Sequence, residues 1–320
     1  MSLTDATLKV ERVLKRFGEF TAVEDLSFEV FPGRVFGFLG PNGAGKTTTI
    51  RMIVGITVPD EGHIELFGER MSSKLQDRIG YLPEERGLYK KMKVVDQLSY
   101  FAALKGVPRN TAIERIDFWL DRMGLADWKN KKTTDLSKGM QQKIQFISTV
   151  IHDPELLILD EPFSGLDPIN VEFMIDVLSE LKSRSKTIIF STHLMETAER
   201  LCNDILLINK GRKVVSGSLR EVKASYGHNR LSLRVIGGDA VLADRSIVAS
   251  VIEHADEMNI ELTDGADAQV LLKRLLESGA VVNKFEAVEP SLNDIFIEQV
   301  GGANNPTETP ASLANRQIHA

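Results

Sequence analysis

The chain has a single cysteine and no long apolar run. Because Cys202 stands alone among 320 residues, no intramolecular disulfide can form, and we expect a reducing cytosol as its compartment. Apolar stretches such as Leu156–Leu159 and Ile205–Ile208 have the length of a strand, far below the roughly 18 residues of a membrane-spanning helix. The first residues, MSLTDATLKVERV, become polar at once and show no signal-peptide core. These absences argue against a leader and a membrane span, and Cys202 is expected to be a small core residue.

An excess of positive charge is also missing. Lys and Arg together number 39 against 45 Asp and Glu, which gives a formal net charge of −6. A negative protein is poorly suited to the phosphate backbone, so general binding of nucleic acid is not expected. The hydrophobic and charged fractions, 42% and 26%, are ordinary for a globular protein, and 320 residues suit one large and one small domain.

The order of the apolar segments predicts an α/β fold. Continuous apolar stretches typical of buried strands occur at Val35–Leu39, Leu156–Leu159, Ile188–Phe190 and Ile205–Ile208. Helical patterns separate them at Ile169–Leu181 and Leu194–Leu201, an alternation that indicates a parallel sheet covered on both faces. Between about residues 85 and 153 helices dominate instead, with apolar residues at three- and four-residue spacings in Val94–Leu104, Thr111–Met123 and Gly139–His152.

A second unit is expected to begin near Arg230. Its predicted strands are Leu231–Val235 and Val281–Phe285, and its predicted helices are Ala243–Ala255, Ala268–Ser278 and Ser291–Gln299. We therefore predict a large domain over 1–228 and a small α+β domain over 229–301. Residues 302–320, rich in Asn, Pro and Thr, are expected to form a disordered tail.

A phosphate-binding loop follows the strand predicted at Val35–Leu39. The pattern is matched at every fixed position by Gly40, Pro41, Asn42, Gly43, Ala44, Gly45, Lys46 and Thr47, with Thr48 next. The glycines let backbone N–H groups surround phosphates without a Cβ in the way, and the next helix adds its positive N-terminal end. We expect residues 40–48 to bind a nucleotide, with Lys46 at the β- and γ-phosphates and the Thr47 hydroxyl on Mg²⁺.

Two adjacent carboxylates end the apolar strand Leu156–Leu159. Asp160 and Glu161 could be a solvated strand end, but four apolar residues precede them and Pro162 restricts the exit of the chain. This placement favours a functional pair at the carboxyl edge of a buried sheet, where Asp160 faces a metal and Glu161 an attacking water.

A further segment, 24 residues before Asp160, completes a recognisable set. It consists of Leu136, Ser137, Lys138, Gly139 and Met140, and a later strand ends at His193. In order and spacing these motifs resemble the ATP-binding subunits of ABC transporters over roughly residues 5–225. The common family sequence is LSGGQ, so Lys138 and Met140 depart from it while Ser137 and Gly139 are kept. A hydroxyl and a backbone amide at a helix N-terminus suit a γ-phosphate of the partner subunit, and Lys138 adds positive charge.

The resemblance implies a fold and several residue roles. The fold is a P-loop NTPase (RecA-like) core with an antiparallel β subdomain and a helical signature subdomain. Asp160 then holds Mg²⁺ through water, and Glu161 orients or deprotonates the hydrolytic water. His193 resembles the switch histidine at the γ-phosphate, and Phe17 the aromatic that stacks on adenine, with Phe20 close by. The family's D-loop, which crosses the dimer interface, is matched by Ser164, Gly165, Leu166 and Asp167.

One position differs from the usual family pattern. Glu84 stands where most members have a glutamine that senses the metal and the γ-phosphate. This substitution, the LSKGMQQK segment and the small C-terminal domain resemble the branch of ABC-2 exporter ATPases that includes the sodium-exporting NatA type. We expect Glu84 to approach the catalytic Mg²⁺; the alternative is a solvated residue paired with Arg86.

By the same resemblance, the chain is an ATP-hydrolysing subunit on the inner face of the cell membrane. Two such chains would dimerise head to tail, as a homodimer or with a paralogue, and clamp two MgATP. Closure would drive integral-membrane permease subunits, with sodium or a drug-like compound as the exported substrate. The alternative is a non-transport ABC ATPase acting on ribosomes or DNA, but the chain has neither a second cassette nor a coiled-coil insertion. A P-loop GTPase is disfavoured because Asn209-Lys210-Gly211-Arg212 lacks the base-reading aspartate.

Overall fold

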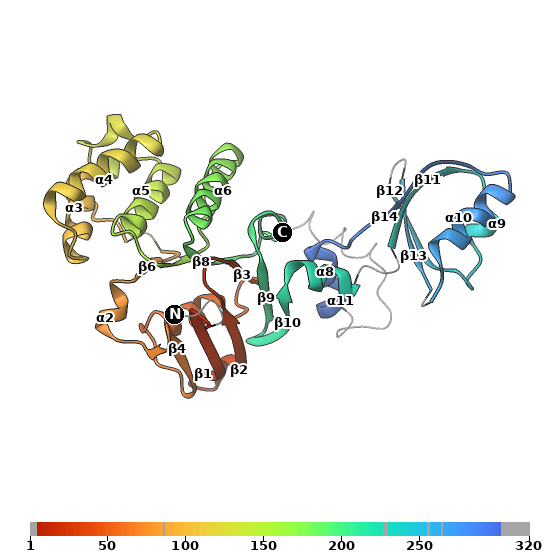
Figure 1. Ribbon diagram of the computed structural model, residues 1–320, viewed down its shortest axis with the longest axis horizontal. Coiled ribbons are helices and arrows are strands. Elements are labelled where there is room, and N and C mark those ends of the chain that lie inside the picture. The colour runs from red at the N-terminus through yellow and green to blue at the C-terminus, as the bar shows by residue number, and fades with distance from the viewer. Residues whose placement is uncertain (1–4, 86, 227–229, 255–256, 264, 302–320) are drawn as a thin grey trace. The chain divides into compact units, whose positions relative to one another are not determined.

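The computed structural model describes residues 5–85, 87–226, 230–254, 257–263 and 265–301 (Figure 1). The chain divides into two compact units, Met1–Leu219 and Arg220–Ala320. Two expectations concern residues outside the described ranges: the disordered tail at 302–320 and the pairing of Glu84 with Arg86. No helix among the described residues is long and apolar enough to cross a membrane.

A six-stranded sheet forms the centre of the first unit. Its strands, in the spatial order β10-β9-β3-β8-β7-β6, are β10 (Arg212–Ser218), β9 (Asp204–Asn209), β3 (Val35–Leu39), β8 (Thr187–Thr192), β7 (Leu156–Asp160) and β6 (Ile79–Leu82). The pairings are parallel except for the antiparallel edge strand β10. Every residue of β3, β7 and β8 is buried, as expected of central strands covered on both faces. These strands confirm the predicted α/β core.

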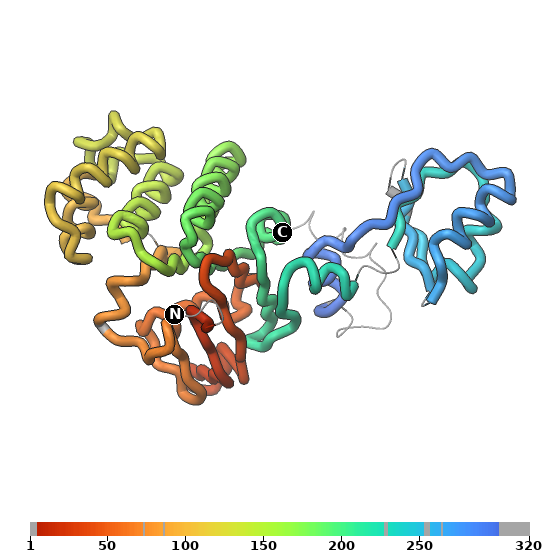
Figure 2. Tube along the Cα trace, viewed as in Figure 1, coloured from red at the N-terminus to blue at the C-terminus, as the bar shows by residue number. Residues whose placement is uncertain are grey.

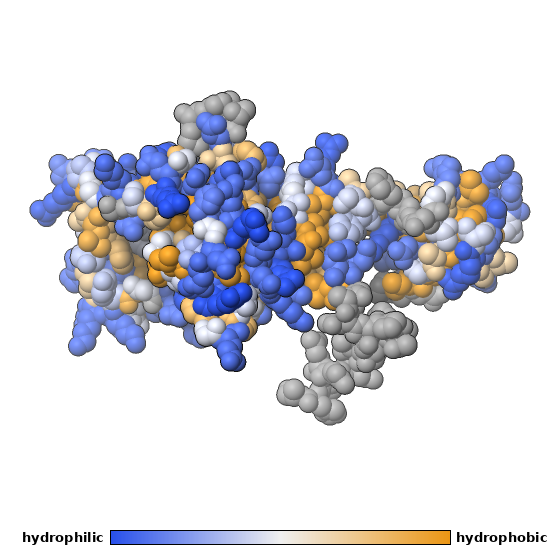
Figure 3. All heavy atoms as spheres, turned by 90° about the horizontal axis from the view of Figure 1, so that it is seen from below, coloured by the Kyte–Doolittle hydropathy of each residue, from blue (hydrophilic) through white to orange (hydrophobic). Residues whose placement is uncertain are grey.

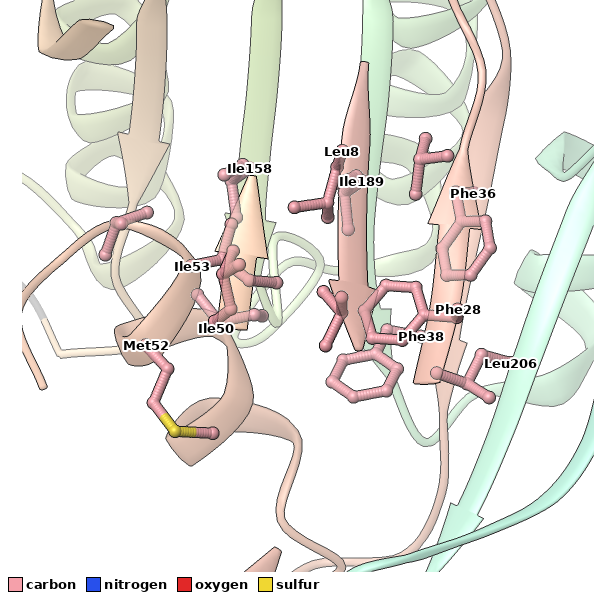
Figure 4. Packing of buried hydrophobic residues seen from close by; sticks show 14 of the residues in the cluster. Leu8, Phe28, Phe36, Phe38, Ile50, Met52, Ile53, Ile158, Ile189 and Leu206 are labelled. Carbon is pink, nitrogen blue, oxygen red and sulfur yellow. The ribbon is translucent and has the colours of Figure 1, made fainter. Parts of the chain in front are cut away.

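A second, antiparallel sheet packs against this core. Its order is β2-β1-β4-β5, formed by β2 (Phe20–Val30), β1 (Leu8–Phe17), β4 (Glu61–Leu66) and β5 (Glu69–Arg70). One apolar cluster joins the two sheets through the helix α1 (Lys46–Ile53). In Figure 4 the ring of Phe28 from β2 lies against Phe36 and Phe38 from β3, with ring centroids 5.4 and 5.8 Å apart. This cluster supports the helix that follows the phosphate loop.

Helices make up the remainder of the first unit. They are α2 (Ser73–Gln76), α3 (Val94–Leu104), α4 (Arg109–Arg122), α5 (Lys138–Val150), α6 (Pro168–Ser183) and α7 (Met195–Leu201), with short 3₁₀ turns η1 (Ala126–Trp128) and η2 (Thr133–Asp135). The helices α3, α4 and α5 gather into the yellow and green group of Figure 1. After α7, Cys202 is buried and would lie 2.5 Å from a Cβ at Gly37, which confirms it as a core residue. Burial also raises the pKa of its thiol.

The second unit contains a smaller antiparallel sheet. After α8 (Leu219–Tyr226), the elements are β11 (Arg230–Ile236), α9 (Asp239–Leu242), β12 (Val248–His254), β13 (Glu257–Leu262), α10 (Ala268–Glu277), β14 (Val281–Ala287) and α11 (Leu292–Gly301). The sheet order is β12-β13-β11-β14, and all pairs are antiparallel. The order β-α-β-β-α-β with this pairing is the ferredoxin-like split β-α-β arrangement, whose chain path is traced in Figure 2.

One secondary-structure prediction in the second unit was wrong. We expected a helix over Ala243–Ala255, but Val248–His254 is the edge strand β12. Ile247, Val248, Val251 and Ile252 are β-branched, which favours a pleated strand, and pairing with β13 outweighs the helical spacing.

Hydrophilic side chains cover much of the molecular face drawn in Figure 3, as the charged fraction of the sequence leads one to expect.

Candidate nucleotide-binding site

The loop between β3 and α1 has the geometry of a phosphate-binding loop. Gly40 has φ 154°, and a Cβ there would lie 2.3 Å from the carbonyl oxygen of Ile208. At Gly45, with φ 104°, a Cβ would lie 2.6 Å from the carbonyl oxygen of Ala22. Glycine is therefore required at both positions by conformation and by space. Since no side chain caps the N-terminus of α1, its first N–H groups are available to an anion.

A cavity of about 410 Å³ opens at this loop. Its wall contains the predicted loop residues from Asn42 to Thr48 and brings in Glu84 and Glu161 from other parts of the chain. Phe20 also lines it and is 64% exposed, whereas Phe17 is not among its lining residues and has Lys15 Nζ 5.5 Å from its ring centroid. We predicted Phe17 for the adenine, but of these two side chains it is the neighbouring Phe20 that forms part of the cavity wall.

Lys46 lies beneath the loop with its charge partly satisfied. The ammonium donates to the carbonyl oxygens of Gly40 and Pro41 at 2.8 and 3.2 Å. Its Nζ is also 3.5 Å from Glu161 Oε1, and both side chains are less than 10% exposed. A buried cation held this way can exchange weak carbonyl contacts for stronger ones to phosphate oxygens.

Asp160 ends β7 as a completely buried carboxylate. Its Oδ1 accepts a hydrogen bond from the Ser191 hydroxyl at 2.5 Å, while Oδ2 has no hydrogen-bond partner among the described residues. Burial raises the pKa of Asp160. A buried acceptor without a donor is costly, so this oxygen fits a cation.

The polar groups around Asp160 fit Mg²⁺. The Thr47 hydroxyl lies 3.5 Å from Glu84 Oε2, and Glu84 and Glu161 line the same cavity. Within the described ranges, no three His, Cys, Asp or Glu side chains are grouped so as to hold a metal by themselves. Because Mg²⁺ usually takes one or two carboxylates and completes its shell with water and phosphates, this residue set fits a metal that arrives with the nucleotide.

Glu161 occupies a strained and central position. Its φ is +48°, in the left-handed region that side-chain-bearing residues rarely adopt, and its N–H donates to the Ser191 hydroxyl at 3.0 Å. Its Oε1 lies 3.1 Å from Nδ1 of His193, which is half exposed just beyond β8. The structure thus brings together Lys46, Glu161 and His193, which lie far apart in the sequence.

The predicted signature residues lie elsewhere on the surface of the first unit. Ser137 caps α5, and its hydroxyl accepts the N–H of Met140 at 3.3 Å. Ser137 and Lys138 are exposed, and none of the signature residues lines the cavity at the phosphate loop. A Cβ at Gly139 would lie 3.6 Å from the Leu166 side chain, so the start of α5 adjoins the predicted D-loop. At the end of that loop Asp167 caps α6.

Sequence reasoning missed three polar side chains that hold the site together. Ser191 contacts both Asp160 and Glu161. On α5, Gln142 donates to the carbonyl oxygen of Pro162 at 3.2 Å. Gln145 donates to the carbonyl oxygens on either side of Glu84, those of Pro83 at 3.0 Å and Glu85 at 3.1 Å. The available signal was a polar residue inside an otherwise apolar strand or helix face.

Comparisons with known proteins identify the family. Residues 23–164 match the family model described as ABC transporter. The chain is 45% identical over 294 residues to the uncharacterized ABC transporter ATP-binding protein YhaQ of Bacillus subtilis, covering 92% of this chain and 98% of that protein. The chain belongs to the ABC transporter ATP-binding proteins. Residues 217–300 match the C-terminal domain model of DrrA1-3-like ATP-binding proteins.

A further relative and two solved structures are also similar to this ABC ATP-binding protein. The Nod factor export ATP-binding protein I of Ralstonia nicotianae is 36% identical over 253 residues, 78% of each chain. A solved ATP-binding subunit of an ABC transporter is 30% identical with a TM-score of 0.65, covering 69% of this chain and 93% of that one. The cbiO1 subunit from Clostridium perfringens, part of the cbiONQ complex, is 28% identical with a TM-score of 0.62, covering 69% and 92%.

Membership of the family confirms the predicted fold, activity and general role. The protein is an ATP-binding subunit of an ABC transporter, of a family that hydrolyses ATP to power transport. Subunits of this family work with membrane permeases, and this one carries a DrrA-like C-terminal domain.

Proposed function

We propose that the cavity binds ATP with Mg²⁺ and that Lys46, Glu161 and His193 carry the hydrolysis. The observation that supports this most is their convergence beside the phosphate loop, where Glu161 Oε1 is within 3.5 Å of both nitrogen atoms. Lys46 and the backbone N–H groups of residues 42–48 bind the phosphates. An aromatic side chain stacks on the adenine: Phe17, as the family resemblance implies, or Phe20, which lines the cavity.

Mg²⁺ would be held by Asp160 and the Thr47 hydroxyl, with Glu84 nearby. The unpaired Asp160 Oδ2 supports this assignment. When bound, the ion neutralises negative charge that the phosphates accumulate during transfer. Asp160 needs to stay ionised for this task. Burial, the largest influence, raises its pKa, and the hydrogen bond that Ser191 donates to Oδ1 opposes this by favouring the ionised form.

Glu161 is assigned to the attacking water. Its contacts to Lys46 and His193 both involve Oε1, so we assign Oε2 to orient the water and accept its proton. His193 contacts the Glu161 carboxylate, and we assign its half-exposed ring to the γ-phosphate. The buried position of Glu161 keeps competing solvent away.

A second copy of the chain, or a paralogue, completes the site in this proposal. The signature residues Ser137, Lys138, Gly139 and Met140 do not line the cavity of their own chain, although the start of α5 offers a hydroxyl and helix amides to an anion. A head-to-tail dimer brings this surface to the partner's γ-phosphate. The D-loop residues Ser164, Gly165, Leu166 and Asp167 adjoin Gly139 and suit the same interface.

We further propose that hydrolysis drives export through separate permease subunits at the inner face of the membrane. The name of the Nod factor export relative supports the direction of transport. Glu84, LSKGMQQK and the C-terminal domain support the NatA-type branch and a sodium or drug-like substrate. We assign ATP binding to residues 1–228, with a helical subdomain over about 85–153, and a separate α+β domain to 229–301.

The test is the Glu161→Gln variant, which keeps the size of the side chain but removes the base. We expect ATP binding near the parent level, ATP turnover reduced by at least about 100-fold, and an ATP-bound dimer on size-exclusion chromatography with Mg²⁺. The control is Glu172→Gln, which alters an exposed carboxylate paired with Arg200. Turnover at the parent rate in Glu161→Gln would refute the assigned base.

A further inference from the structure

Strands β7 and β8 bring a buried hydroxyl to the carboxylate pair. In their parallel register Asp160 pairs with Ser191, and the Ser191 residue is completely buried. The hydroxyl donates to Asp160 Oδ1 at 2.5 Å and accepts the N–H of Glu161 at 3.0 Å. One side chain therefore contacts both members of the pair.

The first contact sets the orientation of Asp160. A serine hydroxyl has a single proton, and here it is directed to Oδ1. Oδ1 is thereby held on the β8 side, and Oδ2 is left without a partner among the described residues. The cost of this unpaired oxygen is recovered only when a cation or a donor arrives.

The second contact holds the backbone of Glu161. With φ at +48°, this residue adopts a conformation that costs free energy unless its surroundings enforce it. The hydrogen bond from its N–H to Ser191 enforces it from the neighbouring strand. The side chain is then directed to Lys46 and His193, at 3.5 and 3.1 Å.

Other hydroxyls of β8 have different tasks. Thr187, at the opposite end of the strand, accepts the N–H of Gly33 at 3.0 Å, and Thr192 accepts the N–H of Leu194 at 3.0 Å. Each serves the backbone at an end of the strand and has no hydrogen bond to Asp160 or Glu161 in the described structure. Ser191 differs from both because it contacts the carboxylate pair.

We propose that Ser191 is a positioning residue for the ATPase reaction, which sets Asp160 toward the metal of MgATP and fixes Glu161 toward Lys46 and His193. This inference rests on the proposed roles of Asp160 and Glu161. It also makes the site depend on a residue outside all of its recognised motifs.

The test compares Ser191→Ala and Ser191→Cys with the control Thr187→Val. Thr187→Val also removes a buried hydroxyl from β8, but at the end away from the site. Cysteine is close to serine in size and is a weaker donor, so it retains part of the contact without leaving a void. Thermal unfolding of each purified variant identifies the folded ones, on which the other measurements are made.

Two measurements separate positioning from folding. Binding of trinitrophenyl-ATP, followed by fluorescence in EDTA and across a Mg²⁺ titration, should show metal-free binding unchanged in Ser191→Ala and the half-saturating Mg²⁺ concentration raised about tenfold. In steady-state assays at saturating Mg²⁺, kcat should fall about tenfold or more while KM for MgATP changes little. Ser191→Cys should lie between Ser191→Ala and the parent, and Thr187→Val should match the parent.

The outcomes also distinguish this inference from the proposed function. If Glu161→Gln forms the ATP-bound dimer while Ser191→Ala and Ser191→Cys keep the parent's Mg²⁺ response and kcat, the positioning role is wrong and the catalytic assignment stands. If Thr187→Val has the same effect as the Ser191 variants, the site depends on the integrity of β8 in general, and the positioning role of Ser191 is wrong. Failure of Glu161→Gln to retain ATP binding and lose turnover contradicts the proposed function itself.

Discussion

Two carboxylates, one in each unit, show how environment separates a structural charge from one prepared for chemistry. Glu257, at the start of β13, accepts hydrogen bonds from Lys284, Ser232 and Arg234. The Lys284 ammonium above all lowers the pKa of Glu257. Asp160 accepts a hydrogen bond from Ser191, its Oδ2 has no hydrogen-bond partner within the described ranges, and burial raises its pKa. The satisfied carboxylate stabilises a sheet, whereas the unsatisfied one retains capacity for a ligand.

The contrast teaches that a buried carboxylate with an unpaired oxygen is available to a ligand, whereas a half-buried carboxylate held by cations is not. The second unit contains many charged side chains, yet Glu257 is surrounded by cations that complete its interactions. In the first unit the polar atoms without partners include Asp160 Oδ2 beside the phosphate loop. A buried polar atom that lacks a partner in the protein is expected to obtain one from a ligand, ion or water.

The largest effect is expected from Lys46→Ala. Lys46 is the cation within the phosphate loop, and the backbone N–H groups of residues 42–48 alone cannot replace its charge at the phosphates. We expect ATP affinity to fall by at least about 100-fold, which corresponds to about 3 kcal/mol. Isothermal titration calorimetry measures this, with Lys284→Ala on the C-terminal sheet as the control that should bind ATP normally. An affinity within a few-fold of the parent would contradict the assignment of the loop.

A smaller effect, on the free energy of unfolding, is expected from Asp160→Asn and Glu257→Gln, with opposite signs for the two variants. The pKa of Asp160 is raised in the folded state. Its contribution to the stability of the protein is therefore most favourable at low pH and is lost as the pH rises through that pKa. The folded pKa of Glu257 is lowered, so its contribution is present above its unfolded pKa and is lost as the pH falls through the folded value.

Urea unfolding in EDTA from about pH 7 down to about pH 2.5, below the ordinary pKa of a glutamate, measures both variants against the parent. At pH 7 Asp160→Asn should be more stable than the parent by about 1 kcal/mol, the scale of one unfavourable buried polar group, and this gain should shrink toward low pH. Glu257→Gln should be less stable than the parent at pH 7, and that deficit should shrink toward low pH. Parallel curves for the two variants would contradict the distinction drawn here.

The sequence predicted the local structure of the candidate site well, its phosphate loop and the strand before Asp160, because each is a local pattern. A phosphate loop needs glycines at fixed spacing, and the apolar strand Leu156–Leu159 identifies the edge where Asp160 and Glu161 emerge. Contacts between distant segments were harder to predict. Ser191 contacts Asp160 only because β7 and β8 are neighbours in the sheet, and the sequence of neither strand predicts which strand lies beside it. Gln145 likewise reaches the loop at Glu84 across 60 residues or more.

The second unit was less predictable for a related reason. Pairing with β13 makes Val248–His254 a strand, and that partner was not recognised as a strand in the sequence. A short edge strand has a weak period-two pattern, and its β-branched residues fit a helix-length window equally well. Tertiary pairing, rather than local preference, determines its conformation.

The smallest effect is expected from a change at Glu84, a third carboxylate to set beside Asp160 and Glu257. Its Oε2 is 3.5 Å from the Thr47 hydroxyl and it lines the phosphate cavity with Glu161, while Asp160 lies close enough for their charges to interact. Three carboxylates near one phosphate group repel each other and the nucleotide until a divalent cation is present. Glu84→Gln removes one of these charges at constant size, so ATP binding in EDTA should strengthen about threefold and the dependence on Mg²⁺ should weaken by a similar factor.

The matched control for Glu84 is Glu85→Gln, which changes the neighbouring carboxylate outside the cavity wall. Both variants keep the backbone carbonyls that Gln145 holds, so the loop itself should stay in place. A Mg²⁺ titration of ATP binding and of ATPase activity, run beside the parent, measures the effect. An unchanged half-saturating Mg²⁺ concentration in Glu84→Gln would assign Glu84 to the solvated loop. It would also leave Asp160 and Thr47 as the residues through which this chain responds to the metal, because the charge of Glu84 would then not act on the phosphates or on Mg²⁺.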